Sequence, residues 1–134
     1  IDLAVNSKNG HVALGSIAER NEISPQYLEQ VFASLRRAGI VKSVKGSQGG
    51  YLLKYPSSSI TVASIIQALE GTYYLDDEET KTEESAARIA ETIQEDIVDR
   101  VNHGLDQILQ NLTLADLEES FQERQSGGQE MYYI

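Results

Sequence analysis

The sequence predicts a mainly α-helical fold with one small β-hairpin, namely a winged helix-turn-helix followed by a long C-terminal dimerisation helix. Three observations predict it. Two short helical patterns lie close together before residue 40, and a glycine-tipped pair of strand patterns follows directly. Beyond residue 84, apolar residues recur every three or four positions. With 134 residues, 40% of them hydrophobic, the chain has the size of one small globular domain.

The helix-turn-helix is predicted by apolar spacing and by cap residues. Residues 14–21 have the spacing of a short amphipathic helix, and a break follows. Ser24 offers an N-cap oxygen, and Pro25 stands at the first helical position, where its missing N–H costs nothing. Gly39 suits the residue just past the end of this second helix. Its apolar stripe repeats at i, i+3, i+4 and i+7 and consists of Leu28, Val31, Phe32 and Leu35.

A β-hairpin with a glycine-rich tip is predicted after Gly39. Residues 40–44 alternate with a period of two, residues 45–50 carry three glycines, and a second apolar run begins at Tyr51. The glycine loop has a rival interpretation as a phosphate cradle, but it lacks the Gly-Lys-Ser/Thr ending of a nucleotide-binding loop. A hairpin placed directly after a helix-turn-helix is the wing of a winged helix.

The polar face of the second helix predicts DNA binding, because the first turns of a recognition helix reach base edges in the major groove. Gln26 and Gln30 suit adenine, and Glu29 suits the amino group of cytosine. Lys45 at the hairpin tip suits a minor groove. The alternative is an ordinary solvated face, since some helix-turn-helix units bind only protein. The residues expected to neutralise phosphates are Arg36, Arg37, Lys42 and Lys54.

Charge is divided unevenly along the chain. The formal net charge is −10, but residues 1–55 carry +3 and residues 56–134 carry −13. The basic part suits a polyanion, and the acidic part suits solvent or a protein partner. The chain has no cysteine and no apolar run approaching the roughly 20 residues of a membrane span. We therefore expect a soluble, cytoplasmic protein without disulfides, and a further N-terminal segment ahead of Ile1.

The second half predicts a dimerisation helix. Thr61 can cap a helix that ends at Gly71, and the acidic residues that follow indicate a linker. A helix over 84–110 would be about 40 Å long, too long for this domain to cover alone, so a second copy is expected against it. The alternative is a core helix within one chain. The apolar positions expected at the dimer interface are Ile89, Ile93, Ile97, Val101, Leu105 and Ile108.

The C-terminal end is predicted to be a mobile apolar hook. A short capped segment spans residues 114–119, and residues 125–129 indicate a flexible joint because they contain two glycines. Tyr133 and Ile134 then end the chain with an apolar carboxylate terminus, which suits capture in a backbone nest. The alternative is that this tail packs on its own dimer.

Four segments together resemble the Rrf-two family of winged-helix transcriptional regulators. They are SPQYLEQ from Ser24, LRRAGIVKS from Leu35, GSQGGYLL from Gly46 and LEG from Leu69. The resemblance covers roughly residues 1–71 and is looser beyond. It implies a homodimer on a palindromic DNA operator, with the Tyr-Leu-Glu-Gln segment in the major groove and the wing in the minor groove.

The resemblance also implies a role and partners. A cluster-binding branch of the family uses three cysteines, which this chain lacks, and His11 and His103 have no ligand spacing, so no cofactor or metal is expected. The chain is closest in character to the cysteine-metabolism branch, which suggests a repressor and a complex with cysteine synthase through Tyr133 and Ile134. An alternative function is a protein-binding adapter that acts through this tail.

These predictions divide the chain into four parts and one candidate interface. We expect a DNA-binding domain at 1–72, an acidic linker at 73–83, a dimerisation region at 84–124 and a flexible tail at 125–134. No nucleophile–base pair has a plausible spacing, so an enzyme is not expected. The candidate DNA-contacting residues are Ser24, Gln26, Tyr27, Glu29, Gln30, Arg36, Arg37, Lys42, Lys45, Ser47 and Gln48.

Overall fold

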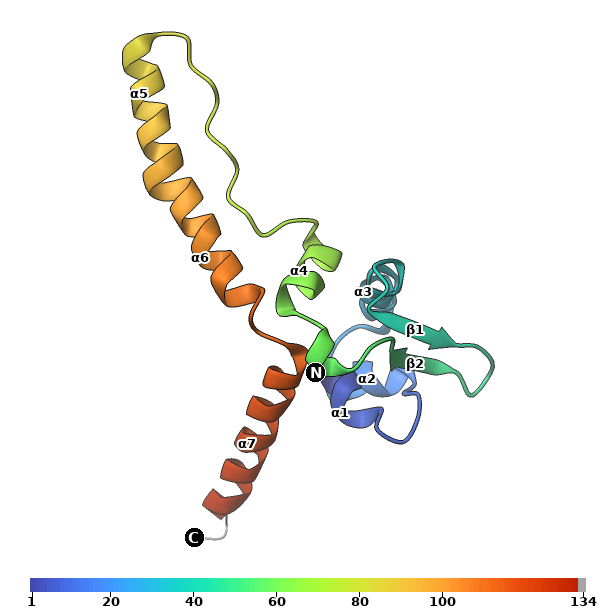
Figure 1. Ribbon diagram of the computed structural model, residues 1–134. Coiled ribbons are helices and arrows are strands. Elements are labelled where there is room, and N and C mark those ends of the chain that lie inside the picture. Colours follow the sequence, from blue (N-terminus) through green and yellow to red (C-terminus); the bar gives the residue numbers. More distant parts are fainter. Residues whose placement is uncertain (133–134) are drawn as a thin grey trace.

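The computed structural model describes the fold of residues 1–132 and the side chains of residues 1–127. A winged-helix head lies beside a long helix, and a final helix runs away from the long one in the opposite direction (Figure 1). Within the described part, no helix has the length and apolar character to cross a bilayer. The elements in order are α1 (Asp2–Asn6), α2 (Leu14–Arg20), α3 (Pro25–Arg37), β1 (Val41–Val44), β2 (Gly50–Leu53), η1 (Ser57–Ser59), α4 (Val62–Glu70), α5 (Glu84–Ile93), η2 (Gln94–Asp99), α6 (Arg100–Leu109) and α7 (Leu114–Tyr132).

The helix-turn-helix forms where the cap residues predict it. Helix α3 begins at Pro25, and the Ser24 hydroxyl oxygen accepts a hydrogen bond from the Tyr27 backbone N–H at 3.4 Å. The helix ends before Gly39, whose φ of +78° is a conformation that favours glycine. Leu28 and Phe32 face the core. Helix α3 is therefore fixed at both ends and along one face.

The wing is an antiparallel hairpin in which Val41 pairs with Leu53 and Val44 pairs with Gly50. Val12 adds a third short edge, because its N–H and C=O both bond to Tyr51. A Cβ at Gly50 would lie 2.3 Å from the Val12 carbonyl oxygen. Only glycine allows this close backbone approach, so Gly50 is required for the wing to join the head.

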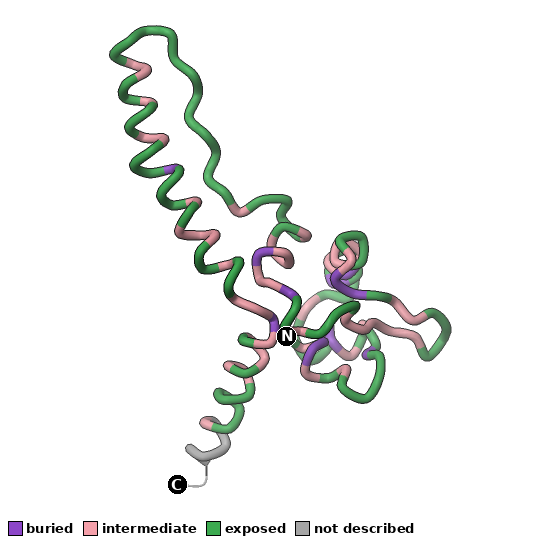
Figure 2. Tube along the Cα trace, viewed as in Figure 1, coloured by how far each residue is buried: buried purple, intermediate pink, exposed green. Residues whose placement is uncertain are grey.

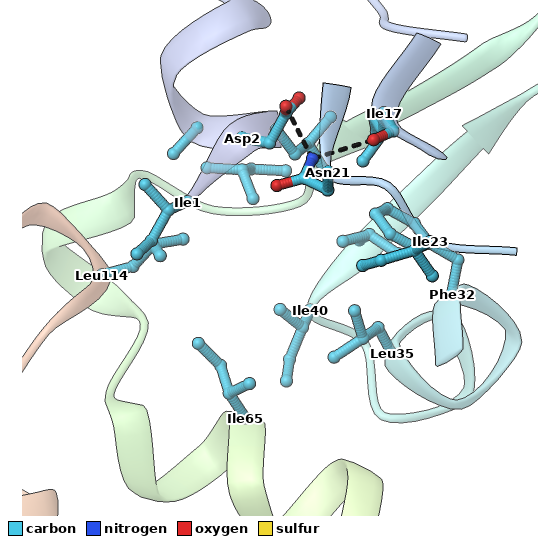
Figure 3. A pocket seen from close by; sticks show the side chains of 14 residues that line it. Ile1, Asp2, Ile17, Asn21, Ile23, Phe32, Leu35, Ile40, Ile65 and Leu114 are labelled. Atoms are coloured by element: carbon cyan, nitrogen blue, oxygen red, sulfur yellow. Dashed lines mark hydrogen bonds between the residues drawn. The ribbon is translucent and has the colours of Figure 1, made fainter. Parts of the chain in front are cut away.

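The core of the head is apolar and draws on most of its elements. Phe32 and Tyr51 meet edge-on with ring centroids 4.8 Å apart. A cavity of about 340 Å³ lies beside Phe32 and is lined mainly by apolar side chains. At its edge the Asn21 amide donates to Asp2 and to the Ile17 carbonyl (Figure 3). The buried cluster consists of Leu3, Ala4, Val12, Ile17, Ala18, Leu28, Phe32, Ile40, Val41, Ile60 and Leu114.

The long helix is continuous over residues 84–109 but is not uniform. Helices α5 and α6 are joined by the π-helical segment η2, which the apolar spacing did not predict. A π turn has i→i+5 hydrogen bonds, so it winds less per residue than an α turn. Figure 2 shows this helix exposed along most of its length, and Val98 is its buried residue. The predicted helix therefore exists, with an underwound turn at its centre.

Helix α7 differs from its prediction. It was expected to be a short segment over 114–119 with a flexible joint at 125–129, but one helix runs from Leu114 to Tyr132. Leu114 is buried in the head core, which anchors the start of α7. The glycines lower helix propensity without ending the helix, because each costs only about 1 kcal/mol relative to alanine. The predicted hook residues Tyr133 and Ile134 lie outside the described residues.

Candidate nucleic-acid interface

The N-terminal half of α3 presents polar side chains to solvent. Leu28 is only 4% exposed and holds the helix against the core, whereas Gln26, Glu29 and Gln30 on the other side are exposed. Tyr27 is 60% exposed even though it is aromatic. Ser24, whose hydroxyl caps the helix, is also exposed. Amide, carboxylate and phenol groups therefore stand together on a rigid helix end, as a major-groove reader requires.

The basic residues at the other end of α3 form a second group. Arg36 donates from Nη1 to the Ser43 hydroxyl at 3.4 Å, and Arg37 donates from Nη2 to the Ser34 hydroxyl at 3.0 Å. The arginines lie about 15 Å along the helix from Gln26, at 1.5 Å per residue. Among the described residues, neither arginine has a carboxylate within 4 Å, and the same is true of Lys42. Their charges are available to phosphates.

The wing tip forms a third group. Lys45, Ser47 and Gln48 are exposed, and Gly46 turns the chain with a φ of +114°. A ring nitrogen of His11 contacts the Gln48 carbonyl and so ties the tip to the loop before α2. Local spacing did not predict this role for His11, because the contact spans 37 residues and depends on the tertiary fold.

The eleven predicted DNA-contacting residues therefore lie in three exposed groups rather than in one continuous patch. These are the helix tip, the far end of the helix and the wing tip. Capping and periodicity account for the first group, and the turn glycines account for the third. The separation suits a duplex, whose groove and flanking phosphates are spread over a comparable length.

Comparison with known proteins identifies the family. Residues 1–120 match the sequence profile of the Rrf2 family, which is described as iron-dependent transcriptional regulators. The chain belongs to the Rrf2 family. It is 38% identical over 121 residues to the HTH-type transcriptional regulator CymR of Bacillus subtilis, which covers 87% of this chain and 79% of CymR.

Solved structures of Rrf2 regulators have the same fold. IscR of T. potens superimposes with a TM-score of 0.68 and 38% identity, over 92% of this chain and 80% of that one. CymR (YrzC), the global cysteine regulator of B. subtilis, superimposes with a TM-score of 0.62 and 36% identity, over 89% and 86%. The predicted winged-helix fold class and family are confirmed. The protein is a DNA-binding transcriptional regulator and not an enzyme, as its relatives indicate.

The iron in the description of the Rrf2 family does not fit the side chains of this chain. The sequence has no cysteine. His11 contacts the wing, and His103 lies on α6. The Asp106 carboxylate accepts hydrogen bonds from two tyrosines. Within the described residues, no three His, Asp or Glu side chains gather closely enough to hold a metal ion.

The predicted dimer residues lie along the exposed side of the long helix. Ile89 is 61% exposed, Ile97 52%, Val101 41% and Ile108 63%. Ile93 and Leu105 are half-buried. An isolated exposed isoleucine is ordinary, whereas here several exposed apolar side chains lie along one helix.

A group of polar residues that the sequence analysis did not single out lies on the strap, the segment 72–81 between α4 and the long helix. Tyr73 and Tyr74 both donate their hydroxyl hydrogens to the Asp106 carboxylate, at 2.5 and 2.8 Å. These hydrogen bonds lower the pKa of Asp106. They also raise the pKa of Tyr73, and that of Tyr74 to about 12. The linker was predicted as an acidic connection, and its docking on α6 has no local sequence signal.

Proposed function

We propose that two copies of this Rrf2 regulator join through their long helices and bind a palindromic operator as a repressor. Each copy contributes one α3 tip to a major groove and one wing tip to a minor groove. The observation that carries the proposal is the combination of two exposed surfaces on one chain. One is the exposed polar face of α3, whose other face is buried in the core. The other is the row of exposed apolar side chains on the long helix.

Base reading is assigned to the tip of α3. Glu29 accepts a hydrogen bond from a cytosine amino group, and Gln26 and Gln30 pair with adenines. Because α3 is capped by Ser24 and held by Leu28, these side chains start from a fixed backbone. Arg36, Arg37 and Lys42 contact phosphates, which position the protein without reading sequence.

Minor-groove contact is assigned to Lys45 at the wing tip, with Ser47 and Gln48 beside it. Lysine brings charge without the planar, weakly hydrated guanidinium that favours narrow A·T tracts. We therefore expect a weaker A·T preference at the wing positions than an arginine would give. The contact of His11 with Gln48 holds the tip in place.

The spacing of the apolar row supports self-association. Ile89, Ile93, Ile97, Val101 and Leu105 recur at intervals of four residues. In an α-helix each such step drifts by about 40°, so the row would wind about 160° around the helix. The π turn of η2 lies within this stretch and winds less per residue, which keeps the row closer to one side. A row that stays on one side suits an identical helix against it.

The test is operator selection followed by a salt series. Binding-site selection from random DNA with purified protein should return a palindrome. Affinity for that palindrome should fall steeply as salt rises, because Lys and Arg release counterions from the duplex. Selection of a sequence without two-fold symmetry, or an affinity that ignores salt, would contradict the proposal.

Cysteine and sulfur metabolism is the proposed pathway, because the chain is 38% identical to CymR and because CymR is the global cysteine regulator of B. subtilis. Cysteine synthase is the protein partner proposed with it, through Tyr133 and Ile134. Capture of cysteine synthase by the full chain but not by a chain lacking these two residues, with operator binding unchanged in both, tests this partner. Equal capture by both chains would contradict it.

A further inference from the structure

The strap is docked on the long helix through its backbone. The Asn102 side chain accepts from the Leu75 N–H at 2.8 Å and donates to the Leu75 carbonyl at 3.2 Å. Farther along, the Gln94 side chain accepts from the Glu78 N–H at 2.7 Å and donates to the Asp77 carboxylate at 2.9 Å. The strap therefore runs along the surface of the long helix and is held there by two helix side chains.

Asp106 fixes the beginning of the strap, where it leaves α4. Its carboxylate accepts from Tyr73 and Tyr74, and the Gln110 amide donates to the Tyr73 hydroxyl at 3.2 Å. The two tyrosine rings also lie against each other, with centroids 4.9 Å apart. Tyr73, Tyr74, Asp106 and Gln110 therefore form one hydrogen-bonded cluster, and Asn102 bonds to the neighbouring backbone of Leu75. We call these four residues and Asn102 the clamp.

The π turn brings Gln94 into line with the clamp. Gln94 and Asn102 are eight residues apart, and in a pure α-helix they would point about 80° away from each other. The underwound segment η2 lies between them and removes part of this offset. The clamp lies on a different face from the apolar row, because Asn102 and Asp106 directly follow Val101 and Leu105 and are each about 100° from them. The strap therefore leaves the row open.

The opposite end of α4 is tied to the connection between α6 and α7, just beyond the long helix. The Val62 N–H donates to the Leu112 carbonyl, and the Leu114 N–H donates to the Ile60 carbonyl, both at 2.8 Å. Helix α4 thus has its N-terminus bonded to the segment that follows the long helix, and its C-terminal extension is held at Asp106. Because α4 packs against α3, these ties connect the recognition helix to the long helix.

We propose that the clamp, centred on Asp106, positions the winged-helix head relative to the long helix and so sets the spacing between half-sites that the dimer accepts. Asp106, Tyr73 and Tyr74 are positioning residues and do not touch DNA. This inference rests on the proposed dimer. A head held at one angle meets one spacing of half-sites, whereas a head freed at one end of α4 meets several.

The test is a series of palindromic duplexes that differ only in the number of base pairs between the selected half-sites. The variants are Asp106→Ala and the double change Tyr73→Phe with Tyr74→Phe, which keeps both rings and removes only the hydroxyls. Gln107→Ala is the matched control, since Gln107 is exposed on α6 and its side chain is outside the clamp. Asp106→Asn keeps one oxygen that can accept and serves as the conservative rescue.

The wild type and Gln107→Ala should bind one spacing at least about tenfold more tightly than its neighbours. The two clamp variants should lose most of that preference while they keep wild-type affinity for a single half-site, and Asp106→Asn should recover part of it. Faster amide exchange in residues 73–78 shows that the clamp is open in the variants. If the clamp is open in the variants and they still prefer the same half-site spacing as the wild type, this inference is wrong and the dimer proposal is unaffected. A wild type that prefers no palindrome at any spacing would overturn the dimer proposal and the inference with it.

Discussion

The head and the long helix differ in how much of their apolar surface the chain itself buries. The head covers its apolar side chains within one chain: Leu28 and Phe32 are at most 6% exposed, while the residues proposed to read bases face outward. The long helix covers little, and Ile89 and Ile108 are more than 60% exposed. The difference is that the head buries its own apolar core, whereas the long helix keeps an apolar row that the proposed second copy would cover. The proposed base reading therefore belongs to the head, and the proposed two-fold pairing belongs to the long helix.

The largest expected effect comes from a charge placed in the apolar row. Ile97→Glu should weaken self-association by at least about 100-fold, because a dimer would have to bury an unpaired carboxylate. Light scattering on the purified protein measures this change, and operator affinity should fall with it. Gln107→Glu adds the same charge to an exposed position outside the row and should leave the mass unchanged. Equal masses for the wild type, Ile97→Glu and Gln107→Glu would show that the apolar row is not part of the dimer interface.

A second change breaks the head and leaves the long helix alone. Gly50→Ala places a Cβ 2.3 Å from the Val12 carbonyl oxygen, so the junction of wing and head must shift. We expect a loss of about 2–3 kcal/mol in stability and a weaker operator complex. Thermal unfolding measures the first effect. Gly15→Ala is the control, because its Cβ would meet nothing within 4 Å and alanine suits a helix better. A stable Gly50→Ala protein would refute the role assigned to that glycine.

Two substitutions in α3 distinguish base recognition from phosphate contact. Glu29→Ala should relax base preference at one operator position by about 1–2 kcal/mol and change random-DNA binding little. Arg37→Ala should weaken binding to both DNAs alike and lower the salt slope by about one. Titrations of specific and random duplexes at several salt concentrations distinguish the two. An equal loss on both DNAs for Glu29→Ala would remove it from base reading.

The features that the sequence predicts correctly are those that depend on one short segment of the chain. The cap at Ser24, the stop at Gly39 and the apolar rows of α3 and the long helix all depend on neighbours within a few residues. The contact of His11 with Gln48 and the clamp at Asp106 join residues more than 30 positions apart, so no local pattern predicts them. The π turn was also not predicted, although the repeated spacing of four residues through it exceeds the 3.6-residue period of an α-helix. The glycines near residue 127 weaken α7 without ending it, so the flexible joint predicted from them does not form.

The smallest expected effect is a change in tyrosine titration on the strap. Asp106 raises the pKa of Tyr74 to about 12, so this contact stabilises the fold below the ordinary value of 10 and is lost as pH rises through about 12. The lowered pKa of Asp106 means that its share is present above 3.8 and is lost as pH falls through the lowered value. His103 is the nearby basic group that also lowers the pKa of Asp106. The clamp should therefore stay closed throughout the neutral range.

Ultraviolet absorbance of tyrosinate measures this titration directly. The chain has seven tyrosines, and Tyr74 should ionise late among them. Tyr74→Phe should remove a late step, and Asp106→Asn should move the Tyr74 step toward ordinary alkaline pH. Tyr55→Phe is the control, because Tyr55 is 54% exposed and is not among the tyrosines that donate to Asp106. A titration curve that Asp106→Asn leaves unaltered would show that Asp106 does not hold the strap tyrosines in solution.

We propose that the protein binds its operator only as a dimer, in which two long helices pair and each head contacts one half-site. The mass of the complex between the protein and its selected palindromic duplex, measured by light scattering, tests this directly. We expect two chains on each duplex and two chains in the free protein. A single chain on the full operator that binds with undiminished affinity would contradict it.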